Sequence, residues 1–157
     1  LAKQIDVKVR EASGFIDEYF VTYPGVKTFI DNTKDQAREA HQVSTIMGRV
    51  RRLPDITSNN PRLRSFQERV AVNTPIQGSA ADLIKLAMLA VDEKISHIDD
   101  EIRILLQVHD ELLIELPAER VDEISVLVRE AMEQVMELSV PLVVDIHTGA
   151  NWAEAHD

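Results

Sequence analysis

Alternation of apolar and polar positions is clearest over residues 102–117, which read IRILLQVHDELLIELP. Aliphatic side chains recur at every second position on both sides of a short polar centre, Gln107 to Glu111. Period-two alternation is typical of β-strands that bury one face. We therefore expect a β-hairpin over about residues 102–116.

The length of the hairpin loop decides which side chains share a face. A two-residue loop at His109-Asp110 would place Val108 opposite Glu111, whereas a three-residue loop would place Val108 opposite Leu112. A change of one residue in register moves every side chain to the other face. Only the three-residue loop gives one wholly apolar face, so we expect His109, Asp110 and Glu111 to form the tip.

Helical periodicity accounts for most of the remaining chain. It predicts a first helix from an N-cap at Asp6 to about Tyr23 and a second helix that begins at Pro24. The further predicted elements are two short strands over 43–53 with a turn near Met47-Gly48, a loop over 54–61, a helix from about Pro61 that is interrupted at Thr74-Pro75, helices over 80–95 and 117–138, and a last strand over 140–146.

These elements predict an α+β fold, with a small antiparallel sheet centred on the hairpin and covered by several helices. The 157 residues suffice for a core, and without a repeat or linker we expect one continuous unit. No apolar run reaches the roughly 20 residues that span a membrane. The chain has no cysteine, which excludes disulfides and thiolate metal sites and fits a reducing cytoplasm.

The net charge of −10 argues against nucleic acid as a partner, but the charge is uneven. From Arg49 to Arg69 the chain has six arginines and only two acidic residues, Asp55 and Glu68. The acidic excess lies mainly over 92–101 and 115–137. A local basic patch can still bind phosphate, so the total charge excludes nothing.

Asp110 is a candidate metal ligand. A carboxylate at the tip of a rigid hairpin can bind a hard cation such as Mg²⁺, and two-metal phosphoryl-transfer sites use such carboxylates. Asp is also common in turns, and the residue types of His109, Asp110 and Glu111 alone favour an ordinary polar turn.

Arg69, Asn73 and Gln77 follow one another at intervals of four. On a helix this spacing forms one polar stripe. Such donors suit the minor groove of DNA, where every base pair presents acceptors in similar places. A solvated helix face fits the spacing equally well, so both interpretations stay open.

Several separated strings resemble the family-A DNA polymerases, the bacterial DNA polymerase I type. QVHDELLIE is similar to the third conserved motif of that family, and ERVAVNTPIQGSAADLIKLAM is similar to the helix-kink-helix block before it. YFVTYPGV, RRLPDITSNN and the final GANWAEAH resemble the neighbouring segments. The resemblance covers essentially the whole chain in family order, which is far more specific than one short motif.

The resemblance implies catalytic roles at the hairpin tip. Asp110 matches the palm aspartate that binds the catalytic metals, and Glu111 matches its acidic neighbour. His109 matches the histidine near the primer end. The residues that match duplex contacts, largely in the minor groove, are Arg69, Asn73, Gln77 and Gln107.

The implied reaction is attack of a primer 3′-hydroxyl on the α-phosphate of a deoxynucleoside triphosphate, with Mg²⁺ in a two-metal site. The implied partners are duplex primer–template DNA and, in the intact parent, dNTP; the implied location is the bacterial cytoplasm at the nucleoid, without a membrane. Residues 1–60 would belong to the fingers side and 61–157 to the palm.

The family's first motif, with the second metal-binding aspartate, does not occur in these residues, nor does the fingers helix that holds the nucleotide. We therefore expect the chain to be inactive by itself. A missing palm strand would expose a sheet edge and apolar surface, through which the chain could self-associate.

Two other functions are compatible with the residues. One is a catalytically silent module that binds duplex DNA through the Arg69, Asn73 and Gln77 stripe. The other is an unrelated metal-dependent hydrolase that uses His109, Asp110 and Glu111, although it would need ligands that the sequence does not offer.

Overall fold

The computed structural model describes residues 4–156. The chain forms two compact units, one up to Ile76 and one from Gln77, where the sequence predicted one continuous unit. The boundary lies within consecutive helical residues, where no loop, glycine-rich stretch or charge run marks it. Composition therefore gives no signal of this division.

The first unit begins with two helices joined at a proline. α1 spans Val9–Thr22 and α2 spans Pro24–Ala40, with Pro24 in the first turn as predicted. The predicted N-cap at Asp6 is wrong, because Lys8 is the N-cap and the Glu11 carboxylate accepts from its backbone N–H at 3.1 Å. Asp6 has a φ of 51°, outside the extended conformation that an N-cap adopts.

A small hairpin and a third helix complete this unit. β1 (Gln42–Ser44) and β2 (Val50–Arg52) are antiparallel, and Gly48 lies in their connecting turn with a φ of 77°, which confirms the predicted strands and turn. After the predicted loop, α3 spans Pro61–Asn73. The buried core of the unit is made by Ala37, Leu53, Ile56 and Ala71.

The interruption predicted at Thr74-Pro75 takes the form of a π-helical turn, η1 (Thr74–Gly78), directly before α4 (Ser79–Ile95). Pro75 has no N–H for an α-helical hydrogen bond. The Thr74 hydroxyl donates to the Val70 carbonyl at 2.7 Å. Such turns inside helices are frequent at functional sites.

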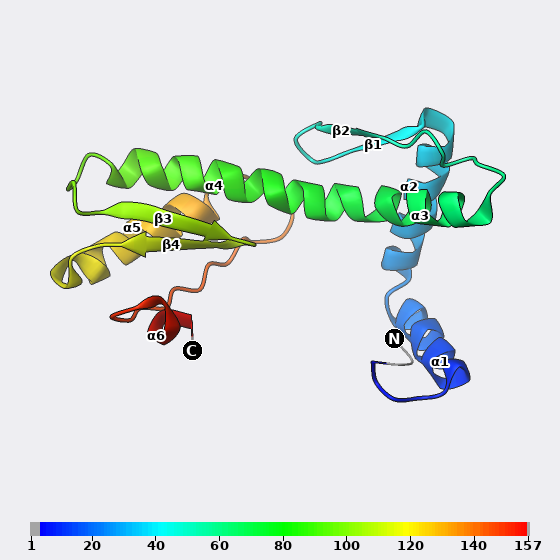
Figure 1. Ribbon diagram of the computed structural model, residues 1–157, viewed down its shortest axis with the longest axis horizontal. Helices are drawn as coiled ribbons and strands as arrows, with labels where there is room; N and C mark the ends of the chain where they lie inside the picture. The colour runs from blue at the N-terminus through cyan, green and yellow to red at the C-terminus, as the bar shows by residue number, and fades with distance from the viewer. Residues whose placement is uncertain (1–3, 157) are drawn as a thin grey trace. The chain divides into compact units, whose positions relative to one another are not determined.

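The second unit packs helices around a hairpin, as Figure 1 shows. β3 (Arg103–Val108) and β4 (Glu111–Glu115) are followed by a short 3₁₀ turn, η2 (Ala118–Arg120), then by α5 (Val121–Glu133) and α6 (Trp152–His156). α5 is therefore shorter than the helix predicted over 117–138. The buried core of the unit is Val91, Ile95, Ile102, Ile124, Val128 and Ala131. Helices with two small antiparallel sheets confirm the predicted α+β class.

The register of the β3–β4 hairpin differs from the prediction. Val108 pairs with Glu111, so His109 and Asp110 form a two-residue loop and the predicted three-residue loop is wrong. The register then shifts between Ile104 and Leu106, so that Ile104 pairs with Ile114. Leu105 is one extra residue in β3, as in a β-bulge. Because it shifts the alternation of β3 by one position, Ile104 still lies on the core-facing side with Leu112 and Ile114 although the loop has only two residues.

Residues 140–146 were predicted as a strand but do not form one. Leu142, Val144 and Ile146 are half-buried and alternate with exposed residues, so the period-two pattern is present. Within the described residues no strand pairs with this segment, and the Val144 N–H instead donates to the Glu133 carboxylate at 3.0 Å. None of the helices in the described range is long and apolar enough to cross a membrane.

Candidate functional site

The tip of the β3–β4 hairpin carries the predicted catalytic residues. His109 occupies the first position of the loop with a φ of 53°, a left-handed conformation that is uncommon for a residue with a Cβ. The Gln107 side-chain amide donates to the His109 carbonyl and so closes the turn. Asp110 follows, exposed to solvent. The loop thus presents this carboxylate at the end of a two-stranded support.

The observed register places Gln107 and Glu111, two polar residues near Asp110, on opposite faces of the hairpin. Gln107 pairs with Leu112, which packs against the core, whereas Glu111 pairs with Val108 on the other face. Leu106, on the Glu111 face, is 47% exposed. The predicted wholly apolar face is therefore wrong at Leu106, which the shift at Leu105 turns to the outer face.

The C-terminal helix α6 brings one further residue to the tip. The His156 Nδ1 lies 3.8 Å from the Glu111 Oε2, and both side chains are exposed. In the sequence, no metal-ligand spacing links His156 to the other histidines. It lies 45 residues from Glu111 in the chain, and no periodic or motif signal connects the two.

The tip carries two adjacent acidic residues. Asp110 and Glu111 provide carboxylate oxygens, the ligand type that Mg²⁺ prefers. Among residues 4–156 no group of three or more His, Cys, Asp or Glu side chains is arranged to hold a metal ion. The metal-binding role of Asp110 and the assisting role of Glu111 stay predictions.

Arg69 and Asn73, two of the predicted DNA contacts, lie one α-helical turn apart on α3 in the first unit, and both are exposed. Arg69 donates to the Ser65 hydroxyl at 3.2 Å, and its guanidinium lies 6.0 Å from the centre of the Phe66 ring. The Asn73 amide has no side-chain hydrogen bond in the described part of the chain.

Gln77, the third residue of the predicted stripe, is exposed and lies in η1 at the start of the second unit. The four-residue spacing of an α-helix thus holds from Arg69 to Asn73, while Gln77 lies in a π-helical turn with a different periodicity. Their joint role in binding a duplex stays a prediction.

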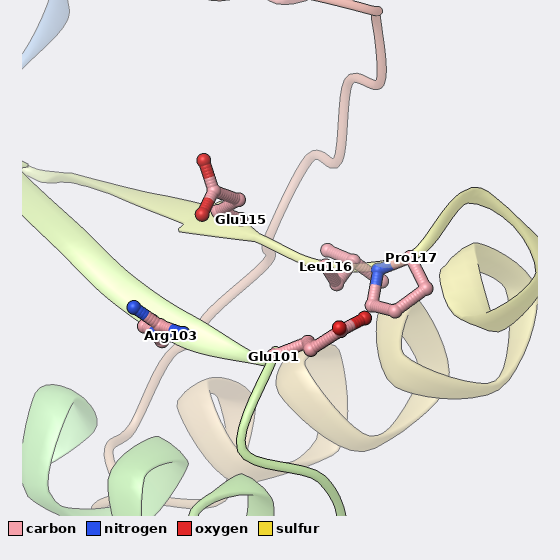
Figure 2. A pocket seen from close by; sticks show the side chains of 5 residues that line it. All are labelled: Glu101, Arg103, Glu115, Leu116 and Pro117. Atoms are coloured by element: carbon pink, nitrogen blue, oxygen red, sulfur yellow. The ribbon is translucent and has the colours of Figure 1, made fainter.

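A shallow pocket of about 320 Å³ lies at the other end of the β3–β4 hairpin, where β3 begins and β4 ends. Figure 2 shows its lining by Glu101, Arg103, Glu115, Leu116 and Pro117. None of these is a predicted catalytic or DNA-binding residue. The pocket is therefore separate from the tip that carries Asp110.

Comparison with known proteins gives the class to which this chain belongs. The family model for DNA polymerase family A matches residues 1–154, and the chain is a member of that family. This confirms the resemblance found in the sequence.

The individual relatives are bacterial. The chain is 48% identical over 155 residues to DNA polymerase I of Geobacillus stearothermophilus and 46% identical over 155 residues to that of Lactococcus lactis subsp. lactis. In both cases the match covers 99% of this chain and 18% of the relative. This chain therefore spans about a fifth of the length of these relatives.

A solved structure with the same fold is the POL domain of Pol1 from M. smegmatis in complex with DNA primer-template and dNTP. The TM-score is 0.94 with 43% sequence identity, over 100% of this chain and 28% of that one. The arrangement described above is thus that of part of a polymerase domain.

Proposed function

We propose that this chain is part of a DNA-directed DNA polymerase and supplies the metal-binding carboxylate Asp110 and part of the duplex-binding surface. The observation that carries this proposal is the position of Asp110, exposed at the tip of a core-anchored hairpin in a chain that belongs to DNA polymerase family A. The M. smegmatis relative, whose structure contains primer-template and dNTP, supports the same partners for this chain.

The chain's own residues have distinct tasks in this reaction. The Asp110 carboxylate binds Mg²⁺, Glu111 assists it from the outer face of the hairpin, and His109 lies at the primer end. Asp110, with ligands from elsewhere in the polymerase domain, would hold two metal ions, which would supply activation of the primer 3′-hydroxyl and stabilisation of the charge on the leaving pyrophosphate. The hydrogen-bond donors offered to the minor-groove acceptors are those of Arg69, Asn73, Gln77 and Gln107.

Catalysis in this proposal needs a second carboxylate from elsewhere in the polymerase domain. Asp110 and Glu111 come from a single hairpin, whereas two-metal chemistry requires ligands that clamp both the attacking and the leaving oxygen. We expect no primer extension by the purified chain. The fingers assignment of residues 1–60 and the palm assignment of 61–157 belong to the same proposal, as does a bacterial, nucleoid-associated location.

The test uses a chimeric polymerase in which this chain replaces the matching 155 residues of the Geobacillus stearothermophilus DNA polymerase I. We expect primer extension, and a loss of about a thousandfold or more in Asp110→Asn, because the amide lacks the charge that binds Mg²⁺. Asp145→Asn, another exposed aspartate of the same unit, is the matched control and should extend normally. Normal extension by Asp110→Asn would refute the proposal.

A second candidate function applies to the chain by itself, namely a silent module that binds duplex DNA. It is favoured by the exposure of Arg69 and Asn73 one helical turn apart on α3. Fluorescence anisotropy with a primer–template duplex tests it. A silent module binds equally well without Mg²⁺ and after Asp110→Asn, and it loses affinity in Asn73→Ala/Gln77→Ala.

Self-association through the hairpin is the last part of the proposal. Leu105 and Leu106 are each 47% exposed on β3, and no third strand pairs with the β3–β4 hairpin in the described residues. Unpaired edges with apolar side chains favour pairing between chains. Light scattering after size exclusion should show a concentration-dependent mass, and a constant monomer mass would contradict this.

A further inference from the structure

We propose that His156 is a positioning residue for the reaction, acting on Glu111 from the C-terminal helix α6. The inference rests on the polymerase function proposed above and extends it to a residue that has no role in that proposal. It assigns α6 the task of holding the hairpin tip in one orientation.

The turn that leads into α6 is built by its own side chains. The Asn151 Oδ1 accepts from the Glu154 N–H at 3.2 Å, and the Glu154 carboxylate accepts from the Ala150 N–H at 3.1 Å and from the Asn151 amide at 2.7 Å. These reciprocal bonds cap the helix at its first turn. The short helix thus has a defined start, four residues before His156.

Close packing at Gly149 fixes the same turn. A Cβ added to Gly149 would lie 2.6 Å from the Glu154 Cβ and 2.7 Å from the Ala155 backbone nitrogen. Real Cβ atoms do not approach other atoms so closely, so the backbone can pass there only without a side chain. The path of the chain into α6 is therefore set by packing as well as by hydrogen bonds.

α6 places His156 near Glu111 at the tip of the β3–β4 hairpin. His156 Nδ1 lies 3.8 Å from the Glu111 Oε2, while on the other side of Asp110 the Gln107 amide holds the His109 carbonyl. Asp110 therefore lies between Glu111, whose carboxylate is near His156, and His109, whose carbonyl accepts from Gln107. Small displacements of a catalytic group lower the rate steeply, so a contact that orients the tip can affect catalysis without touching the substrate.

The expected loss of kcat is small because both side chains of the contact are exposed. The side chains of His156 and Glu111 are 65% and 55% exposed, and contacts between such exposed groups are weak. We expect His156→Ala in the chimeric polymerase to lower kcat about two- to fivefold. The KM for dNTP and the Kd for primer–template should stay unchanged, because in this proposal His156 acts through Glu111.

Two further variants separate the contact from general damage to α6. His156→Asn places an amide nitrogen near the position of Nδ1 and should restore kcat. His147→Ala removes an exposed histidine from the same C-terminal segment and should leave kcat unchanged. Rescue by asparagine with an unaffected His147 variant supports the positioning role, whereas equal losses in His156→Ala and His156→Asn overturn it.

The same variants in the 157-residue chain give a readout that does not require activity. In two-dimensional ¹H–¹⁵N spectra, His156→Ala should shift the amide signals of residues 109–111, and His147→Ala should not. Unchanged tip signals overturn the proposal. If Asp110→Asn is inactive but His156→Ala extends normally, only this inference fails; if Asp110→Asn is active, the polymerase function itself fails.

Discussion

The two units of this chain are similar in construction but opposite in charge. Each packs helices beside one small hairpin, β1–β2 in the first unit and β3–β4 in the second. Up to Ile76 the sequence contains twelve Lys and Arg against nine Asp and Glu, whereas from Gln77 it contains five against eighteen. The net charge of −10 is the sum of +3 for the first unit and −13 for the second, so it does not show which unit binds DNA.

The difference suggests a division of labour. The basic unit holds Arg69 and Asn73, side chains suited to phosphates and base edges, and the acidic unit holds Asp110 and Glu111, side chains suited to cations. A polymerase needs both, since the duplex must be held while metal ions carry out the chemistry. In our proposal, Arg69 and Asn73 of the first unit bind the duplex together with Gln77 and Gln107 of the second, whereas catalysis depends on the second unit alone.

The largest expected effect concerns the independence of the two cores. Ile124 on α5 is 1% exposed in the core of the second unit, and Ile124→Ala should cost about 2–5 kcal/mol. Amide hydrogen exchange should show the loss of protection in α4 and α5 but not in α2 and α3. Val126→Ala, on the same helix but 55% exposed, should change stability by less than about 0.5 kcal/mol. Equal loss in both units would show that they unfold together.

A smaller effect is expected in the turn of the β1–β2 hairpin. Gly48 has a φ of 77°, and a Cβ there would meet nothing within 4 Å, so the cost of Gly48→Ala is purely one of backbone conformation. We expect about 1–2 kcal/mol of destabilisation by chemical denaturation. Gly14→Ala, inside α1 and also unobstructed, should instead stabilise by about 0.5–1 kcal/mol. The same sign for both variants would contradict this.

The smallest effect concerns the corresponding turn of the β3–β4 hairpin, where histidine occupies the left-handed position. His109→Gly relieves the strain of a Cβ at a φ of 53° but increases the freedom of the unfolded chain. The hydrogen bond from Gln107 to the residue 109 carbonyl is retained, since it involves the backbone. Thermal denaturation should show a stabilisation of less than about 1 kcal/mol, and a clear loss of stability would mean that the imidazole itself supports the turn.

Local pattern predicted the helices that begin at prolines, both hairpins and the loop over 54–61, because proline and period-two alternation act over a few residues. The register of the β3–β4 hairpin was missed, although the adjacent leucines Leu105 and Leu106 break the alternation at the site of the shift. The alternation along one strand does not show which residue of the partner strand lies opposite each position once an extra residue shifts the register.

Whether residues 140–146 form a strand, and whether His156 meets Glu111, depends on residues far away in the sequence. Alternation gives a segment the side chains of a strand, but the strand forms only if another backbone lies beside it. The hairpin tip with Asp110 could be located from the sequence, whereas its support by α6 could not.

The most direct test of the division of labour measures binding and chemistry separately in the chimeric polymerase, with Asn73→Ala in the first unit and Asp110→Asn in the second. Asn73→Ala should weaken primer–template affinity about two- to tenfold, since one or two hydrogen bonds are lost, and should still extend primers at saturating DNA. Asp110→Asn should bind DNA normally and fail in single-turnover extension. Loss of DNA binding in Asp110→Asn, or loss of chemistry at saturating DNA in Asn73→Ala, would contradict the account.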